Sequence, residues 1–166
     1  MNKPSRLFLS FVILAFLSGC SEKEFQHSSS SMEPTIKRGE VISVDLKAYA
    51  GVSPSRWDVV LFESPLADGG NWASRVAGLP GETIDIRSGH LVIDGKEVAL
   101  PPTLAIASYE LPENNTVPGA NGPVAFPFRI PQGGYFVLGD NTSNALDSRY
   151  WGALEEAKIL GKVLGK

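Results

Sequence analysis

Glycine and proline interrupt this 166-residue chain so often that long regular elements have little room. The sequence holds 17 glycines and 12 prolines. Both residues favour turns and end helices or strands. Hydrophobic residues still make up 43% of the chain, which is enough for the core of one domain. The sequence therefore predicts a β-rich domain of many short strands joined by tight turns rather than a helical bundle.

Short apolar or alternating runs between the turns predict the individual strands. These runs cover residues 40–46, 57–62, 72–77, 83–86, 90–93, 96–100 and 135–138. The dipeptide Asp94-Gly95 separates two of them and is favoured in the two-residue turn of a β-hairpin. We expect one short helical turn at residues 154–159 and a long surface loop over the proline-rich residues 101–128.

The charge of the chain argues against a nucleic-acid partner. The formal net charge is -3 at pH 7, and no cluster of lysines or arginines is present. Because binding to phosphates requires a basic face, we exclude DNA and RNA as partners. Two histidines and one cysteine offer no ligand cluster for a metal, so no metal or organic cofactor is expected.

The N-terminal residues have the pattern of an export signal. Lys3 and Arg6 precede an apolar run over residues 7–17, and the sequence Leu-Ser-Gly-Cys follows, ending at Cys20. This pattern is typical of a bacterial lipoprotein signal, in which the chain is cut before the cysteine and lipid is attached to its sulfur. The apolar run is shorter than the ~20 residues of a membrane span. The alternatives are an uncleaved signal anchor or a buried apolar segment.

Three regions follow from this pattern. Residues 1–19 are expected to be a lipoprotein-type signal sequence, residues 20–28 a polar tether, and residues 29–166 the folded domain. Whether the signal is a cleaved lipoprotein signal or an uncleaved anchor, the folded domain is expected to lie outside the cytoplasm and to be held at a membrane. Cys20 is the only cysteine, so no disulfide framework is possible within one chain.

Three sequence blocks carry the functional signal. The first is Ser-Met-Glu-Pro-Thr at residues 31–35, the second is Ser-Arg-Val-Ala-Gly-Leu-Pro-Gly-Glu at residues 74–82, and the third is the run from Gly139 to Gly152. Together, in this order, they resemble the type I signal peptidases, membrane-bound serine endopeptidases that remove leader peptides from exported proteins. The resemblance extends from Ser29 to about Lys162.

This resemblance implies a fold, a site and a substrate. The fold would be mainly β, with short antiparallel strands in two packed sheets around one core. Ser31 would be the nucleophile, and the hydroxyl of Ser29 with the backbone N–H of Ser31 would form the oxyanion hole. The substrate would be an extended peptide or preprotein with small residues before the cleaved bond, an Ala-x-Ala pattern, bound by strand addition in a groove beside Ser31.

The third block would support the site through a polar network. Its members would be Asp140, Asn141, Asp147, Ser148 and Arg149. Within it, Asp147 and Arg149 are expected to form an ion pair that holds the loop in place. A simple turn at residues 139–141 is compatible with the same role.

The chain departs from the family pattern at the base of the catalytic pair. Ser74 occupies the place of the family's lysine, and Ala145 occupies the place of the serine that hydrogen-bonds that lysine. A serine cannot accept the proton of another serine at neutral pH, and Arg75 stays protonated and faces the other side of its strand. The loss of both residues fits a site that no longer carries the lysine.

Four other residues are candidates for a substitute base. His27 lies four residues before Ser31 and is the strongest candidate, whereas His90 begins a distant hairpin. Lys37 and Lys47 lie on polar segments that are expected to face solvent. Two hypotheses follow: an endopeptidase with an unconventional base or a slow reaction, or a non-catalytic relative that binds extended polypeptides as a chaperone or assembly factor.

Overall fold

The structure is a computed structural model that describes residues 21–66, 69–112 and 124–166. Short strands dominate it, as the sequence predicted. In chain order the elements are β1 (Glu22–Gln26), β2 (Val41–Asp45), β3 (Val59–Glu63), β4 (Asn71–Gly78), β5 (Thr83–Arg87), β6 (His90–Ile93), β7 (Lys96–Glu97), η1 (Pro102–Leu104), β8 (Phe128–Arg129), β9 (Gly134–Leu138), α1 (Ser148–Trp151), β10 (Leu154–Glu155), η2 (Glu156–Lys158) and β11 (Ile159–Val163). No helix within these three ranges is long and apolar enough to cross a membrane.

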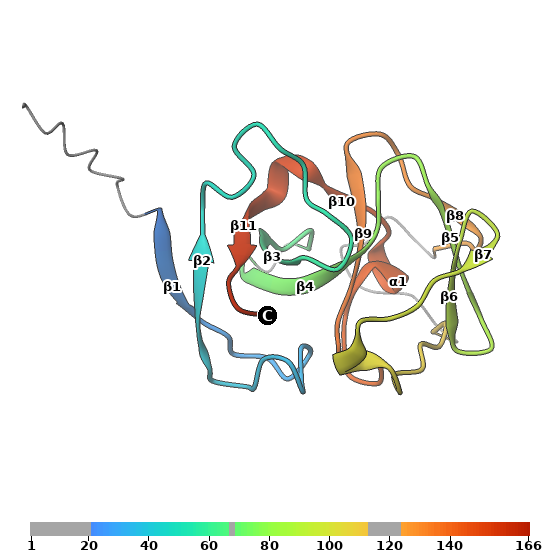
Figure 1. Ribbon diagram of the computed structural model, residues 1–166, viewed down its shortest axis with the longest axis horizontal. Coiled ribbons are helices and arrows are strands. Elements are labelled where there is room, and N and C mark those ends of the chain that lie inside the picture. The colour runs from blue at the N-terminus through green and yellow to red at the C-terminus, as the bar shows by residue number, and fades with distance from the viewer. Residues whose placement is uncertain (1–20, 67–68, 113–123) are drawn as a thin grey trace, which may run out of the picture.

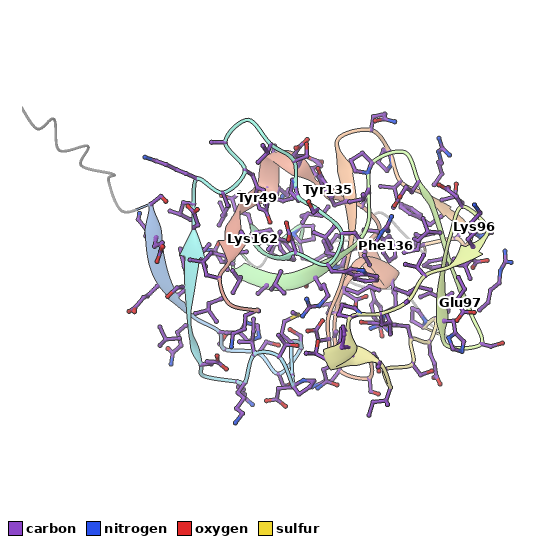
Figure 2. The ribbon with its side chains drawn as sticks, in the orientation of Figure 1. Tyr49, Lys96, Glu97, Tyr135, Phe136 and Lys162 are labelled. Carbon is purple, nitrogen blue, oxygen red and sulfur yellow. The ribbon has the colours of Figure 1, made fainter. Side chains whose placement is uncertain are left out.

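Two antiparallel sheets make up the fold (Figure 1). The larger has seven strands in the order β1-β2-β11-β3-β4-β9-β10, and the smaller has four in the order β7-β6-β5-β8. The smaller sheet lies at the end of the molecule opposite β1. Lys96 and Glu97 mark its outer edge in Figure 2. The prediction of a mainly β fold with two antiparallel sheets is confirmed.

The core is divided into three clusters rather than the single core that was expected. The cause is visible in β3, whose apolar residues alternate between the two faces of the larger sheet. Val59 and Leu61 pack in a cluster with Met32, while Val60 and Phe62 pack on the other face. A sheet that is covered on both faces requires two separate apolar layers. The third cluster joins the two sheets.

Phe136 lies in the cluster that joins the two sheets (Figure 2). Its side chain is fully buried. The ring centroid lies 5.7 Å from that of Phe128 on β8 and 6.0 Å from that of Phe126. Residues of β5 and β6 in the smaller sheet and of β4 and β9 in the larger sheet contribute to the same cluster. These contacts hold the two sheets together.

The hairpin prediction at Asp94-Gly95 is confirmed. Ile93 pairs with Lys96, and both turn residues have positive φ, at 48° and 79°. This is the backbone that a two-residue turn of the I′ type requires. The strand after the turn is shorter than predicted, because β7 ends at Glu97.

The predicted helical turn at residues 154–159 is only partly correct. Residues Leu154–Glu155 form strand β10, and a single turn of 3-10 helix at Glu156–Lys158 leads directly into β11. The predicted loop over residues 101–128 contains the short η1 and the start of β8, and residues 113–123 of it lie outside the described part.

The structure differs from the expected polar tether at residues 20–28. Residues Glu22–Gln26 form β1, which pairs with β2 over all five residues. Polar side chains on both faces gave no strand signal, but the backbone of the neighbouring strand supplies the hydrogen bonds. The folded domain therefore begins before residue 29. The predicted signal sequence at residues 1–19 and Cys20 lie outside the described residues.

Candidate active site

One pocket of about 240 Å³ brings together residues from three parts of the chain. The segment between β1 and β2 contributes His27, Ser28, Ser29 and Ser31; the start of β4 contributes residues 71–74; and the loop after β9 contributes Asn144 and Leu146. The first and second sequence blocks thus meet at Ser31 and Ser74. The sequence did not single out Asn71, Trp72, Ala73, Asn144 or Leu146 as pocket residues.

The backbone around Ser31 is held by the loop that follows β9. The carbonyl oxygen of Ser31 accepts a hydrogen bond from the N–H of Asn141 at 2.9 Å. The side chain of Asn141 donates to the carbonyl oxygen of Ser30 at 3.1 Å, and that of Asn144 donates to the Ser30 hydroxyl at 2.7 Å. These contacts fix the position of Ser31 relative to the third sequence block. Asn144 was missed because asparagines in loops are usually interpreted as turn formers.

Ala145 and Ser31 both approach Gly139 closely. A Cβ atom placed on Gly139 would lie 2.3 Å from the Ala145 Cβ and 2.7 Å from the carbonyl oxygen of Ser31. Only glycine leaves room for this close approach. Positions 31 and 145 therefore both pack against Gly139, and position 74 faces the pocket that contains Ser31.

Ser29 and the Ser31 backbone are paired with each other. The N–H of Ser31 donates to the Ser29 hydroxyl oxygen at 3.0 Å. In this arrangement the two groups expected to form the oxyanion hole do not both point at one acceptor. Ser29 is exposed, so its side chain can rotate to release the N–H when a carbonyl oxygen takes its place.

Ser74 is buried at 4% exposure and pairs with Val60 of β3. Arg75, its neighbour, points to the opposite side and binds Asp140 through two hydrogen bonds of 2.8 and 2.6 Å. The hydroxyl of Thr35 also donates to Asp140. Asp140 thus links β4 to the turn after Ser31. The expectation that Arg75 faces away from Ser74 is confirmed.

Asp147 and Arg149 form the expected ion pair, with Nε of the arginine 2.8 Å from the aspartate. The same carboxylate caps α1 through the N–H of Arg149 and accepts the N–H of Gly139 at 3.0 Å. Ser148 accepts the N–H of Val137 at 2.9 Å. This network ties α1 to the end of β9, where the loop beside Ser31 begins.

His27 is the titratable residue of the pocket. It is 7% exposed, and its Nε2 has no hydrogen-bond partner in the described part of the chain. Burial lowers the pKa of His27 below its ordinary value of 6.5, although the carboxylates of Glu40 and Glu33 act in the opposite direction. The ring is therefore neutral near pH 7. It lies at the end of β1, not on a free tether as expected.

The other candidate bases do not line this pocket. His90 is 63% exposed on the smaller sheet, where it lies 3.2 Å from Glu97. Lys37 and Lys47 are exposed. None of the described residues that line the pocket is a lysine.

A comparison with protein families identifies the relatives of this chain. The model of the family described as "Signal peptidase, peptidase S26" matches residues 3–165. The chain belongs to the signal peptidase family. The prediction made from the three sequence blocks is confirmed.

Individual family members agree with this assignment. The chain is 33% identical to signal peptidase I V of Bacillus subtilis (strain 168) over 140 residues, which cover 84% of this chain and 82% of the relative. It is 31% identical to signal peptidase IB of Staphylococcus aureus (strain COL) over 166 residues, covering 93% and 82%. A crystal structure of a signal peptidase I from Enterococcus faecalis V583 matches with a TM-score of 0.51 and 35% identity, covering 66% of this chain and 96% of that chain.

Proposed function

We propose that this chain is a serine endopeptidase that cleaves leader peptides from exported proteins at a membrane surface, with Ser31 as its nucleophile. The observation that carries the proposal is the single pocket shared by Ser31, Ser29 and Ser74. Ser31 and Ser74 come from segments 43 residues apart in the sequence and line the same pocket. The named relatives are signal peptidases.

The start of β4 offers a binding edge for an extended substrate. β3 pairs with β4 from Asn71 to Arg75, whereas β9 pairs with β4 only from Arg75 onward. In the described structure no strand therefore pairs with residues 71–74 on the side away from β3. Backbone groups alternate along a strand. The N–H and C=O of Val76 bond toward β3, at Asp58 and Trp57, so those of Asn71 and Ala73 point to the open side.

A peptide added along this edge would run beside Ser31. Strand addition uses the peptide backbone for affinity and shallow pockets for side-chain selection. The pocket of about 240 Å³ is small, which favours small side chains before the cleaved bond. In the proposed reaction, the Ser31 N–H and the Ser29 hydroxyl stabilise the negative oxygen once Ser29 has rotated. Asp140, Asn141, Asp147, Ser148 and Arg149 hold the loop that positions Ser31.

We propose that the N-terminal region brings the domain to the membrane. Lipid attached to Cys20 is the favoured anchor, and an uncleaved signal anchor is the alternative. Because β1 starts at Glu22, only a very short connection separates Cys20 from the folded domain. The site would then work close to the outer face of the membrane. Labelling of cells with a fatty-acid analogue, lost in Cys20→Ala, tests the lipid anchor.

A second candidate function is peptide binding without cleavage. Ser74 and Ala145 favour it, because the pocket lacks the lysine and the serine that the family uses to activate the nucleophile. The same β4 edge would then bind extended polypeptides for a chaperone or assembly role.

The test compares turnover in three forms of the full-length protein in lipid vesicles. With a leader peptide carrying Ala-x-Ala, we expect slow cleavage by the natural sequence and a loss of at least ~100-fold in Ser31→Ala, as for loss of a serine nucleophile. Equal rates in the two proteins would reject the endopeptidase.

The double variant Ser74→Lys with Ala145→Ser separates the two functions. If the natural protein binds the peptide without cleaving it and the double variant gains turnover by orders of magnitude, the second candidate is correct. A natural protein that cleaves, with only a modest gain in the double variant, supports the endopeptidase and a base elsewhere in the pocket.

A further inference from the structure

His27 is held in the pocket by the backbone of the larger sheet. The backbone N–H of His27 donates to the carbonyl oxygen of Glu40 at 2.8 Å, and the backbone carbonyl oxygen of His27 accepts a hydrogen bond from the N–H of Gly39 at 2.6 Å. Ser30, three residues later, is held by Asn141 and Asn144 from the loop after β9. The short segment that joins His27 to Ser31 is thus anchored at both ends. His27 and Ser31, which both line the pocket, are therefore positioned by separate parts of the fold.

The imidazole has an unexplained buried nitrogen. Nε2 of His27 has neither solvent contact nor a hydrogen-bond partner in the described residues. A buried polar atom without a partner usually costs about 1–3 kcal/mol, so it calls for a reason such as strain, an unseen ligand or catalysis. Among the residues that the structure describes, none forms an ion pair with the ring either. The Glu40 carboxylate is engaged by Lys166 and by the N–H of Lys37, and that of Glu33 by the N–H of Arg38.

The pocket supplies no competing proton acceptor. Besides His27, its described lining consists of serines, asparagines, an alanine, a leucine and a tryptophan. Serine and amide side chains do not accept a proton from another serine at neutral pH. A neutral histidine does, and its ordinary pKa lies in the range that general-base catalysis requires.

We propose that His27 is the general base that activates Ser31, an inference that rests on the proposed endopeptidase function. A ring nitrogen of neutral His27 takes the proton of the Ser31 hydroxyl as Oγ bonds to the carbonyl carbon of the substrate. The carbonyl electron pair moves to its oxygen, which the Ser31 N–H and the Ser29 hydroxyl then stabilise. As the C–N bond breaks, the imidazolium gives the proton to the leaving nitrogen.

The second half of the reaction uses the same two residues. His27 takes a proton from water while the water oxygen bonds to the acyl carbon. The proton then passes to Ser31 Oγ as the acyl bond breaks, which restores the starting state. No co-reactant other than water is needed. A base that approaches from the β1 side of the pocket makes an amine at position 74 unnecessary, which is consistent with Ser74 and Ala145.

The substitution His27→Gln removes the titrating group and keeps a polar side chain of similar size. In full-length protein in vesicles, we expect kcat/KM for the Ala-x-Ala peptide to fall by about 10²–10⁴-fold, the usual contribution of a general base. In the natural protein kcat/KM should rise with pH through the pKa of His27 and reach its plateau at a lower pH than a histidine of ordinary pKa would give. Burial holds that pKa below 6.5, against the opposing carboxylates of Glu40 and Glu33. In His27→Gln this rise should be absent.

His90→Gln is the matched control, because His90 is exposed on the smaller sheet away from the pocket. It should retain the rate and the pH profile of the natural protein. His27→Ala provides a readout that a purely structural histidine would not give: added imidazole should raise its rate in proportion to the concentration of the neutral form. The triple variant Ser74→Lys, Ala145→Ser and His27→Gln should regain turnover, which would show that the scaffold still folds.

Separate outcomes would reject this inference and the proposed function. If the natural protein cleaves and Ser31→Ala does not, but His27→Gln keeps the rate and the pH profile, the endopeptidase stands and His27 is not its base. A slow His27→Ala that imidazole fails to rescue also rejects the role as base. If the natural protein shows no turnover at all, both the proposed function and this inference fail.

Discussion

At the scale of single residues, the buried ion pair between Arg75 and Asp140 is a central contact of the site. The arginine side chain is 5% exposed and the aspartate side chain is fully buried. Arg75 follows Ser74 in β4, and Asp140 begins the loop that holds Ser31. One charge pair thus connects the strand and the loop that form two sides of the pocket. Removing one partner of a buried charge pair lowers the stability of a protein strongly, because the other charge stays buried without compensation.

Asp140→Asn should destabilise the protein by about 3–5 kcal/mol, because the guanidinium of Arg75 is left buried without a compensating charge. Urea unfolding followed by tryptophan fluorescence measures this change. Arg87→Gln is the control, since Arg87 is 61% exposed and its pair with Asp85 should contribute less than about 1 kcal/mol. Similar losses of unfolding free energy in the two variants would show that the buried pair stabilises the protein no more than an exposed pair does.

At the scale of secondary structure, the edge strand β1 decides where His27 lies. The sequence Glu-Lys-Glu-Phe-Gln has no alternation of apolar and polar residues, so it gave no strand prediction. Pairing with β2 nevertheless orders all five residues. By contrast, the hairpin at Asp94-Gly95 and the apolar strands β3 and β9 were predictable. Their signals, a turn dipeptide and runs of apolar residues, are contained within a few adjacent residues.

Lys23→Pro and Glu24→Pro form a matched pair for testing β1. The N–H of Leu46 donates to Ser21 and the N–H of His27 donates to Glu40, so Lys23, which has the same parity, bonds to β2 while Glu24 faces outward. Lys23→Pro should therefore lower the free energy of unfolding by about 1 kcal/mol more than Glu24→Pro does. It should also lower the cleavage rate, because it displaces His27. Denaturant unfolding and peptide cleavage are the measurements. Equal behaviour of the two variants would argue that β1 does not position His27.

At the scale of the whole molecule, the cluster around Phe136 connects the two sheets into one folding unit. It combines residues of β5 and β6 with residues of β4 and β9. Gly78 allows this close packing, because a Cβ there would lie 2.4 Å from Ile130 and 3.0 Å from Phe136. The pocket is lined by the start of β4 and by the segments that follow β1 and β9, so none of its described lining residues belongs to this cluster.

Phe136→Ala should lower the free energy of unfolding by about 3–5 kcal/mol through loss of buried contacts and the cavity that remains. Because Phe136 contacts both sheets, tryptophan fluorescence and circular dichroism should still report one shared transition at lower denaturant concentration. Val52→Ala, at a side chain that is 62% exposed, should change stability by less than about 0.5 kcal/mol. Two separate transitions in Phe136→Ala would show that the sheets unfold independently.

The sequence alone determined the family, the mainly β fold and the candidate nucleophile, because short blocks around Ser31, Ser74 and Asp140 carry their signal in adjacent residues. It also revealed that the usual lysine is absent. Only the tertiary structure decided that residues 22–26 are a strand and that His27 shares the pocket of Ser31. The physical reason is that both features depend on a neighbouring strand: β2 supplies the hydrogen bonds that order β1, and the fold then buries His27 between segments that are distant in sequence.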